Sequence, residues 1–308
     1  MTGCPAAASK STACSADAAR ADAGFVLISV LWVVLFLALA AAAFTISVRS
    51  HVQETSAEAA SADARALADA GTQLALHDLV NARISRGWQR RFPTDGRAYT
   101  CTIGAARVTV AVEDEAGKID LNTASDLLLR RLLVGTGLAA VEAERRAAAI
   151  IDYRDADSVR REAGAEAEEY FQAGRRNGPK NAPLDSPLEL AQVLGIDTAL
   201  MARLRPFVTV HSGLQSIDPS KAAPALLAML GAEASLGTSA RLPADIRATS
   251  SPQRVFLVRA QATGERGATF AREMVVRVAP SRSRHFAVLA WRQADAIPGT
   301  DSTDLGPC

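Results

Sequence analysis

Acidic side chains gather in one stretch near the middle of the chain, "IDYRDADSVRREAGAEAEEY". Carboxylates around a turn provide oxygen ligands, of which a hard cation such as Ca²⁺ takes about six to eight. The D-x-D-x-D-G run of an EF-hand is absent from the stretch. The alternative interpretation is a solvated acidic loop that holds no ion. The candidate ligands are Asp152, Asp155, Asp157, Glu162, Glu166, Glu168 and Glu169.

Elsewhere the chain shows no pattern typical of catalysis. It lacks the G-x-S-x-G, H-E-x-x-H and G-x-x-x-x-G-K-[ST] motifs, so we expect a protein that is not an enzyme. The 34 basic and 33 acidic residues nearly balance, which gives no global sign of a polyanion partner. The four histidines are far apart and share no ligand spacing: His51, His77, His211 and His285.

A long apolar segment near the N-terminus predicts a membrane anchor. No charged residue interrupts 25–48, and at about 1.5 Å per residue this helix spans the roughly 30 Å hydrocarbon core. The apolar region of a cleaved signal peptide is shorter, at about 7–15 residues. A buried core helix is the alternative, but the segment is apolar on every side. Residues 1–24, rich in Ala, Ser and Asp, resemble a disposable leader.

The helix is predicted to continue beyond the anchor as a polar stem over 49–88, giving one long helix from roughly 25 to 85. A stripe of small and apolar residues recurs at steps of three and four, which favours close packing against other helices. Pro93 and Gly96 then break the helix. The stripe consists of Val48, Val52, Thr55, Ala59, Ala62, Ala66, Ala70 and Leu74.

The remaining chain alternates between strand and helix patterns. Alternating valines predict strands in 89–115 and 250–293, which together form a small antiparallel sheet. Residues 116–249 have a helical pattern and are predicted to form a domain inserted into that sheet. The tail, 294–308, is predicted to be disordered. Cys308 on this tail would either pair with Cys101 in an oxidising compartment or remain a free thiol.

The predicted insert contains a helix–turn–helix pattern, "DSPLELAQVLGIDTALMARLRPFVTV". Asp185 or Ser186 would cap its first helix, Gly195 would end it, and a second helix would begin near Asp197. Helix-hairpin-helix modules of this kind bind DNA. Residues 113–212, however, hold 13 basic and 17 acidic residues, a net charge of −4 that favours a protein partner over phosphates. A faint repeat also relates 119–133 to 217–231.

Several motifs together resemble one family. "GFVLISVLWVV" is similar to a type IV prepilin leader junction. "DEAGKIDLNTAS", "IIDYRDADS", "KNAPLDSPLELAQVLGI" and the terminal "FAVLAWRQ" resemble the minor pseudopilin K of type II secretion systems, the general secretion pathway protein K family. The resemblance implies an α+β fold: a pilin-like long helix on a small antiparallel sheet with an inserted, helix-hairpin-helix-like all-α domain.

The resemblance also implies a processed N-terminus. A prepilin peptidase would cut between Gly24 and Phe25, and Phe25 would then be N-methylated. Ser29 stands at the fifth mature position, where most pilins carry a Glu that pairs with a neighbour's terminal amine. A carboxylate without a partner is costly in lipid, so its absence suits a tip subunit with no neighbour above it. The alternative interpretation is sequence drift.

The implied function is a structural one in protein secretion. The family caps the tip of a periplasmic pseudopilus and helps start its assembly for the export of folded proteins. Its implied partners are the I, J and H minor pseudopilins, the major pseudopilin, the prepilin peptidase and the inner-membrane assembly platform. We expect a single-pass inner-membrane protein with its globular part in the periplasm and no nucleic-acid ligand.

Members of the family bind calcium in the inserted domain, so the resemblance implies a calcium site here. Asp152, Asp155 and Asp157 match the motif best, and Glu166 and Glu169 complete the predicted set. Two alternative functions remain at this point: a membrane-tethered helix-hairpin-helix DNA-binding protein and a minor pilin of a type IV pilus.

Overall fold

The computed structural model describes residues 16–231, 243, 246, 254–278, 285–297 and 302–308. It divides into two compact units, Met1–Ala59 and Ala60–Cys308. Helix α1 (Ala16–Ile84) provides all of the described structure in the first unit and continues into the second. The predicted C-terminal end of this helix is confirmed, whereas its start lies earlier than predicted, within the expected leader. The first part of that leader, 1–15, lies outside the described residues.

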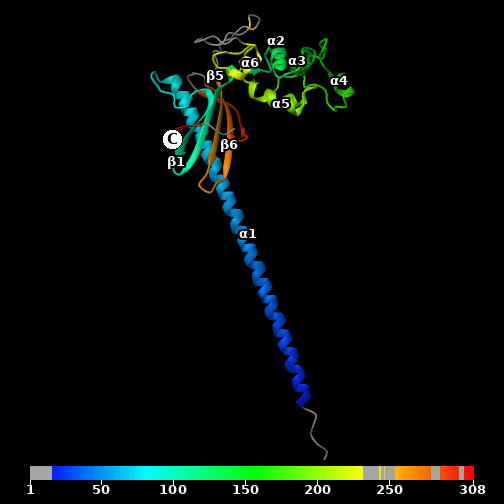
Figure 1. The fold of residues 1–308 in the computed structure, drawn as a ribbon, viewed down its shortest axis with the longest axis vertical. Helices are drawn as coiled ribbons and strands as arrows, with labels where there is room; N and C mark the ends of the chain where they lie inside the picture. The colour runs from blue at the N-terminus through cyan, green and yellow to red at the C-terminus, as the bar shows by residue number, and fades with distance from the viewer. Residues whose placement is uncertain (1–15, 232–242, 244–245, 247–253, 279–284, 298–301) are drawn as a thin grey trace, which may run out of the picture. The chain divides into compact units, whose positions relative to one another are not determined.

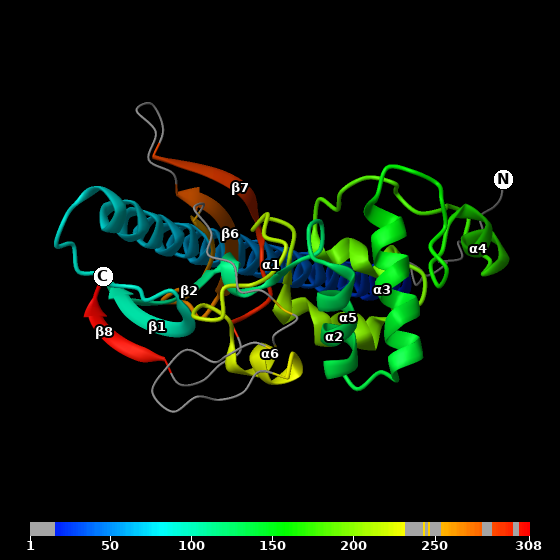
Figure 2. The ribbon, with the colours of Figure 1, turned by 90° about the horizontal axis from the view of Figure 1, so that it is seen from above.

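The second unit is built on one six-stranded sheet in the order β7-β6-β5-β2-β1-β8 (Figures 1 and 2). Neighbouring strands are antiparallel except for β8, which runs parallel to β1 and makes the sheet mixed rather than purely antiparallel. The strands predicted on both sides of the helical block are confirmed. They are β1 (Asp95–Ile103), β2 (Ala106–Asp114), β5 (Arg254–Thr263), β6 (Thr269–Val278) and β7 (Phe286–Gln293). The sixth strand, β8 (Thr303–Pro307), was not predicted.

Helix α1 packs on one face of this sheet through a stripe of small residues. Within Ala60–Ile84 the buried positions include Ala64, Ala68 and Ala75, and they contact the fully buried valines of β2. At Gly71 an added Cβ would lie only 2.7 Å from Cγ1 of Val108, so only glycine permits this close approach. The stripe predicted to pack against other helices is a different one: its members Ala62 and Ala66 are exposed, so packing against other helices stays a prediction. Both sides of the helix carry small residues, and sequence periodicity alone did not separate them.

The prediction of a disordered tail is wrong for 302–308, which form β8 and its flanks, while 298–301 lie outside the described residues. A disulfide joins Cys308 to Cys101 of β1. The Arg91 guanidinium donates to the carbonyl oxygen of Cys308 at 2.9 Å and also to that of Pro307. The tail composition predicted disorder, but the covalent link and these hydrogen bonds hold it against the sheet edge.

The inserted domain joins the sheet between β2 and β5 and has its own apolar core, separate from the core under α1. A short parallel pair, β3 (Ile119–Asp120) with β4 (Val208–Thr209), lies at its base. The predicted helical block is confirmed. It comprises α2 (Asp126–Gly135), α3 (Ala140–Arg154), α4 (Ala167–Gln172), α5 (Thr198–Leu204) and α6 (Pro224–Met229), with 3-10 turns η1 (Glu115–Gly117), η2 (Pro187–Gln192) and η3 (Arg205–Phe207).

The predicted helix–turn–helix pattern is present, with one difference. Ser186 caps the first element by accepting from the N–H of Leu188, and Asp197 caps α5 by accepting from the N–H of Leu200 at 2.7 Å. Gly195 lies between them with φ of 86°, in the left-handed region that ends helices. The first element, η2, is a 3-10 helix rather than an α-helix.

The faint repeat corresponds to a repeated structure. Asp120 Oδ1 accepts from the N–H of Asn122 at 2.8 Å, and Asp218 Oδ1 accepts from the N–H of Ser220 at 3.0 Å. In each copy the N–H four residues after the aspartate donates to its carbonyl oxygen, and a helix follows. The two copies therefore share one turn-then-helix unit, and α2 and α6 pack together at Gly135 and Met229.

A buried ionic group fixes the insert where it leaves β2. Lys118 Nζ lies 2.7 Å from Glu115 Oε1 and 2.8 Å from Glu113 Oε2, and the lysine side chain is only 6% exposed. Thr209 of β4 donates its hydroxyl to the other oxygen of Glu115. The segment that enters the insert and strand β4 inside it are therefore tied through one carboxylate.

The disulfide gives the first testable prediction. Replacing Cys101 and Cys308 by Ser should lower the free energy of unfolding by about 2–5 kcal/mol, because the bridge closes a long loop. Their sequence separation is 207 residues, which places the expected effect toward the upper end. Denaturant unfolding of the full chain in detergent, followed by tryptophan fluorescence, measures the change.

The matched control replaces Cys4 and Cys14, which precede the anchor, and should leave stability unchanged. Equal stability of the C101S/C308S variant and the parent under oxidising conditions would contradict the prediction.

Candidate functional site

The membrane-anchor candidate lies in the first unit. Among the described residues, only Val26–Ile84 is long and apolar enough to cross a membrane, and the side chains of its most apolar part are all exposed. Gly24 and Phe25, the predicted cleavage junction, both lie in α1. Ser29 donates its hydroxyl to the carbonyl oxygen of Val26 at 2.9 Å. The hydroxyl at the fifth mature position is thus satisfied within its own helix and has no need of a charged neighbour.

The predicted calcium ligands occupy the loop between α3 and α4. Asp152 ends a buried turn of α3 and is itself fully buried, and Glu166 is 6% exposed at the start of α4. Asp152 Oδ1, Asp155 Oδ1 and both carboxylate oxygens of Glu166 are buried without a hydrogen-bond partner. Buried charged oxygens without partners are costly, so this arrangement calls for a positive charge.

The backbone around Asp152 is shaped to receive its carboxylate. The N–H of Arg161 donates to Asp152 Oδ2 at 3.2 Å, and the Arg161 guanidinium lies 3.4 Å from Oδ1. At Gly164 an added Cβ would lie 1.9 Å from Asp152 Oδ2. Only glycine leaves room for the carboxylate at this position, so the loop is built around the charge.

The carboxylates of this loop repel one another. Burial raises the pKa of Asp152, and the charge of Asp155 raises it further. Burial also raises the pKa of Asp155, together with the charge of Asp157. For Glu166 the causes are burial first, then Asp152 and Asp155. Asp152, Asp155 and Glu166 therefore form one group of interacting carboxylates. The exposed Asp157 contributes to this group by raising the pKa of Asp155.

Glu169 is not part of this group of carboxylates. One of its oxygens accepts from the N–H of Glu166 at 3.0 Å, and the other lies 3.1 Å from Arg160 Nε. It therefore caps α4 and pairs with an arginine. Glu168 similarly accepts from Gln172 at 2.8 Å on the surface of α4.

Asn181 is a candidate ligand that sequence reasoning missed. Its backbone φ is 49°, in the left-handed region, and its N–H donates to the carbonyl oxygen of Tyr153 at 3.0 Å. Its side-chain Nδ2 donates to the carbonyl oxygen of Asp157, which leaves Oδ1 buried without a partner. The signal available in the sequence was the "KNAPLD" motif that follows the acidic stretch.

The donor types fit a hard cation, because all of the atoms without partners are carboxylate or amide oxygens. Among the described residues, no three Asp, Glu, His or Cys side chains already converge on a single point. The loop therefore has the ligands, and an ion would have to draw them together.

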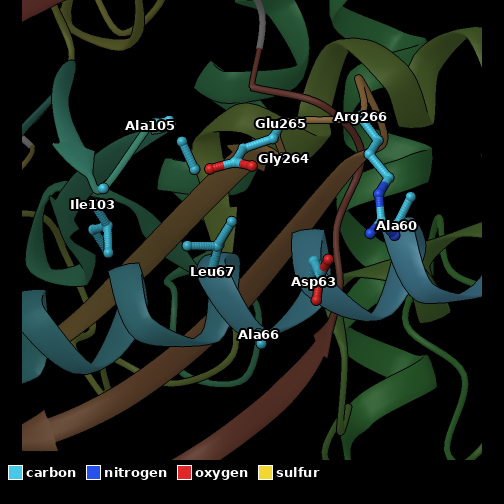
Figure 3. A pocket seen from close by; sticks show the side chains of 11 residues that line it. Ala60, Asp63, Ala66, Leu67, Ile103, Ala105, Gly264, Glu265 and Arg266 are labelled. Carbon is cyan, nitrogen blue, oxygen red and sulfur yellow. The ribbon is translucent and has the colours of Figure 1, made fainter.

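A cavity of about 480 Å³ opens beside α1 and two hairpin turns (Figure 3). Leu67 and Ile103 give it an apolar wall, and Asp63, Glu265 and Arg266 give it charge. None of its lining residues is a Ser, Cys or His, so it offers no nucleophile–base pair for catalysis.

Comparisons with known proteins agree with this structure. Residues 110–213 match the family model described as type II secretion system protein K. In the solved structure of the GspK–GspI–GspJ complex from the type 2 secretion system of enterotoxigenic Escherichia coli, one chain matches with a TM-score of 0.60. The two chains are 18% identical, and the match covers 80% of this chain and all of the other. No curated protein sequence matches significantly.

The long apolar helix, the sheet that packs on it and the inserted domain form the fold shared with that solved structure. The family match covers the end of β2 and most of the insert. Residues 110–213 are therefore similar to protein K of the type II secretion system. The family and fold matches do not favour the DNA-binding and type IV pilus alternatives.

The acidic loop gives the second testable prediction. Calcium should stabilise the full chain at neutral pH, by about 2.7 kcal/mol when its concentration is 100 times the dissociation constant. Each raised pKa means that the folded chain holds its proton more tightly than the unfolded chain. The metal-free protein should therefore gain stability as the pH falls through these values, and the calcium effect should shrink over the same range. Denaturant unfolding with calcium or with a chelator measures both.

Asp152→Asn should abolish the calcium effect, whereas Glu168→Gln, on the neighbouring helix α4 and outside the group, should retain it. Loss of the effect in both variants, or no calcium effect in the parent chain, would refute the site.

Proposed function

We propose that this chain is a minor pseudopilin of the protein K type, which caps the tip of the periplasmic pseudopilus and helps start its assembly, so that folded proteins can be exported. The observation that supports a tip position is where the insert joins the sheet. It leaves β2 at Asp114 and returns to β5 at Arg254, and these strand ends pair with each other near Phe256. Gly264, in the turn at the other end of β5, lies beside Ala60 of α1.

The insert thus lies at the far end of the sheet from the point where α1 enters the second unit (Figure 1). In a filament of packed long helices, the next subunit would be added beyond that end. A folded domain with its own core occupies the position instead. Steric exclusion by the insert ends the filament at this subunit.

The anchor places the chain in the inner membrane, with Ala60–Cys308 in the periplasm. A disulfide in this unit suits an oxidising compartment. Prepilin peptidase would cut between Gly24 and Phe25 and the new N-terminus would be methylated. Ser29 requires no partner amine, because it is satisfied by the carbonyl oxygen of Val26. The chain is a substrate of the peptidase and has no catalytic role of its own.

The partners of this chain are other pseudopilins. The matched structure is titled as a complex of GspK with GspI and GspJ, which supports minor pseudopilins of the I and J types as neighbours. We include the H type, the major pseudopilin and the inner-membrane assembly platform as later contacts. Nucleic acid is not among the partners, because 113–212 carries a net negative charge.

Calcium completes the insert. Asp152, Asp155, Asp157, Glu166 and Asn181 would hold the ion, which supplies positive charge to a group of buried oxygens. Bound calcium fixes the loop between α3 and α4 and so keeps the insert rigid. Glu169 stays outside the ligand set and positions α4.

The tip position gives the third prediction. Antibody to the insert should label isolated pseudopili at one end only. Replacing 116–249 by a short linker removes the obstruction, so label against a tag on the shortened chain should appear along the filament. Immunogold electron microscopy distinguishes the two patterns. Label along filaments that contain the complete chain would contradict the cap.

Processing gives the fourth prediction. Mass spectrometry of the chain from cells with prepilin peptidase should find an N-methylated Phe25 at the N-terminus, and cells without the peptidase should retain the leader. An intact leader in both strains, or a cut beyond Val48, would exclude the pseudopilin pathway.

A further inference from the structure

The 3-10 turn η2 lies close to the sheet, on the face away from α1. Its residues Pro187 and Leu188 line a cavity of about 40 Å³ together with Leu257 of β5 and Val275 of β6. A cavity of this size has room for only a few water molecules, so the turn and the two strands lie near each other.

The side chains of Leu257 and Val275 point away from α1. Their neighbours along the strands, Val258 and Val276, belong to the core under α1, and successive side chains of a strand point to opposite faces. Leu257 and Val275 are nonetheless only 5% and 2% exposed. Because η2 lines the cavity beside them, its position is also a contact between the insert and the sheet.

A turn as short as η2 does not hold its own position. It has six residues, fewer than the roughly 12 that an isolated helix needs for marginal stability in water. Its first turn is closed by Glu189, whose Oε1 accepts from the N–H groups of Asp185 and Ser186 at 2.8 and 3.1 Å. The place of η2 on the sheet therefore depends on contacts with other parts of the insert.

One of these contacts comes from the residue beside a candidate calcium ligand. Lys180, next to Asn181, places its Nζ 2.9 Å from Oε2 of Glu189 and 2.7 Å from Oδ2 of Asp185. Glu189 thus closes the start of η2 with one oxygen and pairs with Lys180 through the other. Leu188 directly precedes Glu189, so Lys180 holds the end of η2 that lines the cavity at the sheet.

Two buried tyrosines make the corresponding contacts at the other end of η2. Tyr153, at the end of α3, donates its hydroxyl to Gln192 Oε1 at 3.1 Å. Tyr170, on α4, accepts from the N–H of Leu194 at 3.0 Å. Both ends of η2 are therefore attached to the elements that flank the acidic loop.

Each of the three stretches that carry a candidate ligand also carries one of these contacts. The ligands Asp152, Glu166 and Asn181 have oxygens that are buried without a partner. An ion bound to all three would fix the three stretches relative to one another. It would thereby fix the contacts that hold η2.

We propose that calcium in the acidic loop seats η2 against the sheet, so that the ion controls how the insert is held there. This inference rests on the proposed function, because the calcium site is part of it. Lys180 is a positioning residue, which contacts Glu189 and not the ion. The orientation of the cap on its sheet thus depends on calcium in the periplasm.

The test places a photo-crosslinking residue at position 188 of the full chain in detergent. The Leu188 side chain is 51% exposed, so the site has room for the probe. The expected product is a crosslink within one chain, from 188 to the segment of β5 or β6 that contains Leu257 or Val275. Its yield, measured by mass spectrometry, should be at least fivefold higher with saturating calcium than with a chelator. Asp152→Asn should give the chelator yield in both conditions.

Lys180→Met tests the connection itself. The variant should still bind calcium in isothermal titration calorimetry, because Lys180 is not a ligand, but saturating calcium should change its crosslink yield less than twofold. The matched control is Arg176→Met, which removes an exposed cation from the same connecting segment and should keep the fivefold change.

Two results would overturn the inference while leaving the calcium site intact. One is an equal yield with calcium and with chelator in a parent chain that binds calcium by calorimetry. The other is a fivefold change that persists in the K180M variant. If the parent chain binds no calcium, the site and the inference fail together, whereas the tip position is judged separately by the labelling of pseudopilus ends.

Discussion

One buried lysine, Lys118, joins the sheet to the start of the inserted domain. Burial alone lowers the pKa of Lys118, but the nearby carboxylates of Glu115 and Glu113 raise it above its ordinary value, so the lysine stays charged. Removing one member of such a group typically costs about 3–5 kcal/mol, because the other charge is left buried. Thr209 of β4, inside the insert, donates to Glu115. The interior of the insert is therefore tied to the segment by which the chain leaves β2, and the steric argument for a tip subunit depends on that attachment.

Local patterns in the sequence predicted most of this fold. Alternating valines in β2 and capping residues such as Ser186 and Asp197 act over a few residues, so their spacing carries the information. The β8 strand escaped prediction because its stability comes from Cys101, about two hundred residues away. The stripe of α1 that packs on the sheet was not predicted either. Small residues occupy both sides of that helix, and only the sheet decides which side is buried.

The sequence predicted which residue types in the acidic loop could be ligands. It did not predict which of these side chains are already bound to other groups of the protein. Asp152, Asp155 and Glu166 were candidates because carboxylates cluster there, and each has at least one buried oxygen without a hydrogen-bond partner. Glu169 has the same side chain as Glu166, yet it pairs with Arg160 and accepts a hydrogen bond from the N–H of Glu166. Asn181 lies outside the acidic stretch, and its left-handed backbone brings it back toward the loop. Ligand identity thus depends on what else each oxygen contacts, which is a property of the fold.

One electrostatic constraint, the cost of a carboxylate without a partner, applies both to the apolar part of α1 and to the acidic loop of the insert. A carboxylate without a partner is costly in lipid, and Ser29 replaces it with a hydroxyl that its own helix satisfies. The carboxylates that lack partners lie instead in a loop of the second unit, where a cation from water can reach them. A subunit inside a filament can use a buried acid because its neighbour supplies the amine. The terminal subunit proposed here has no such neighbour, and the proposed calcium ion would supply the positive charge that the acidic loop lacks.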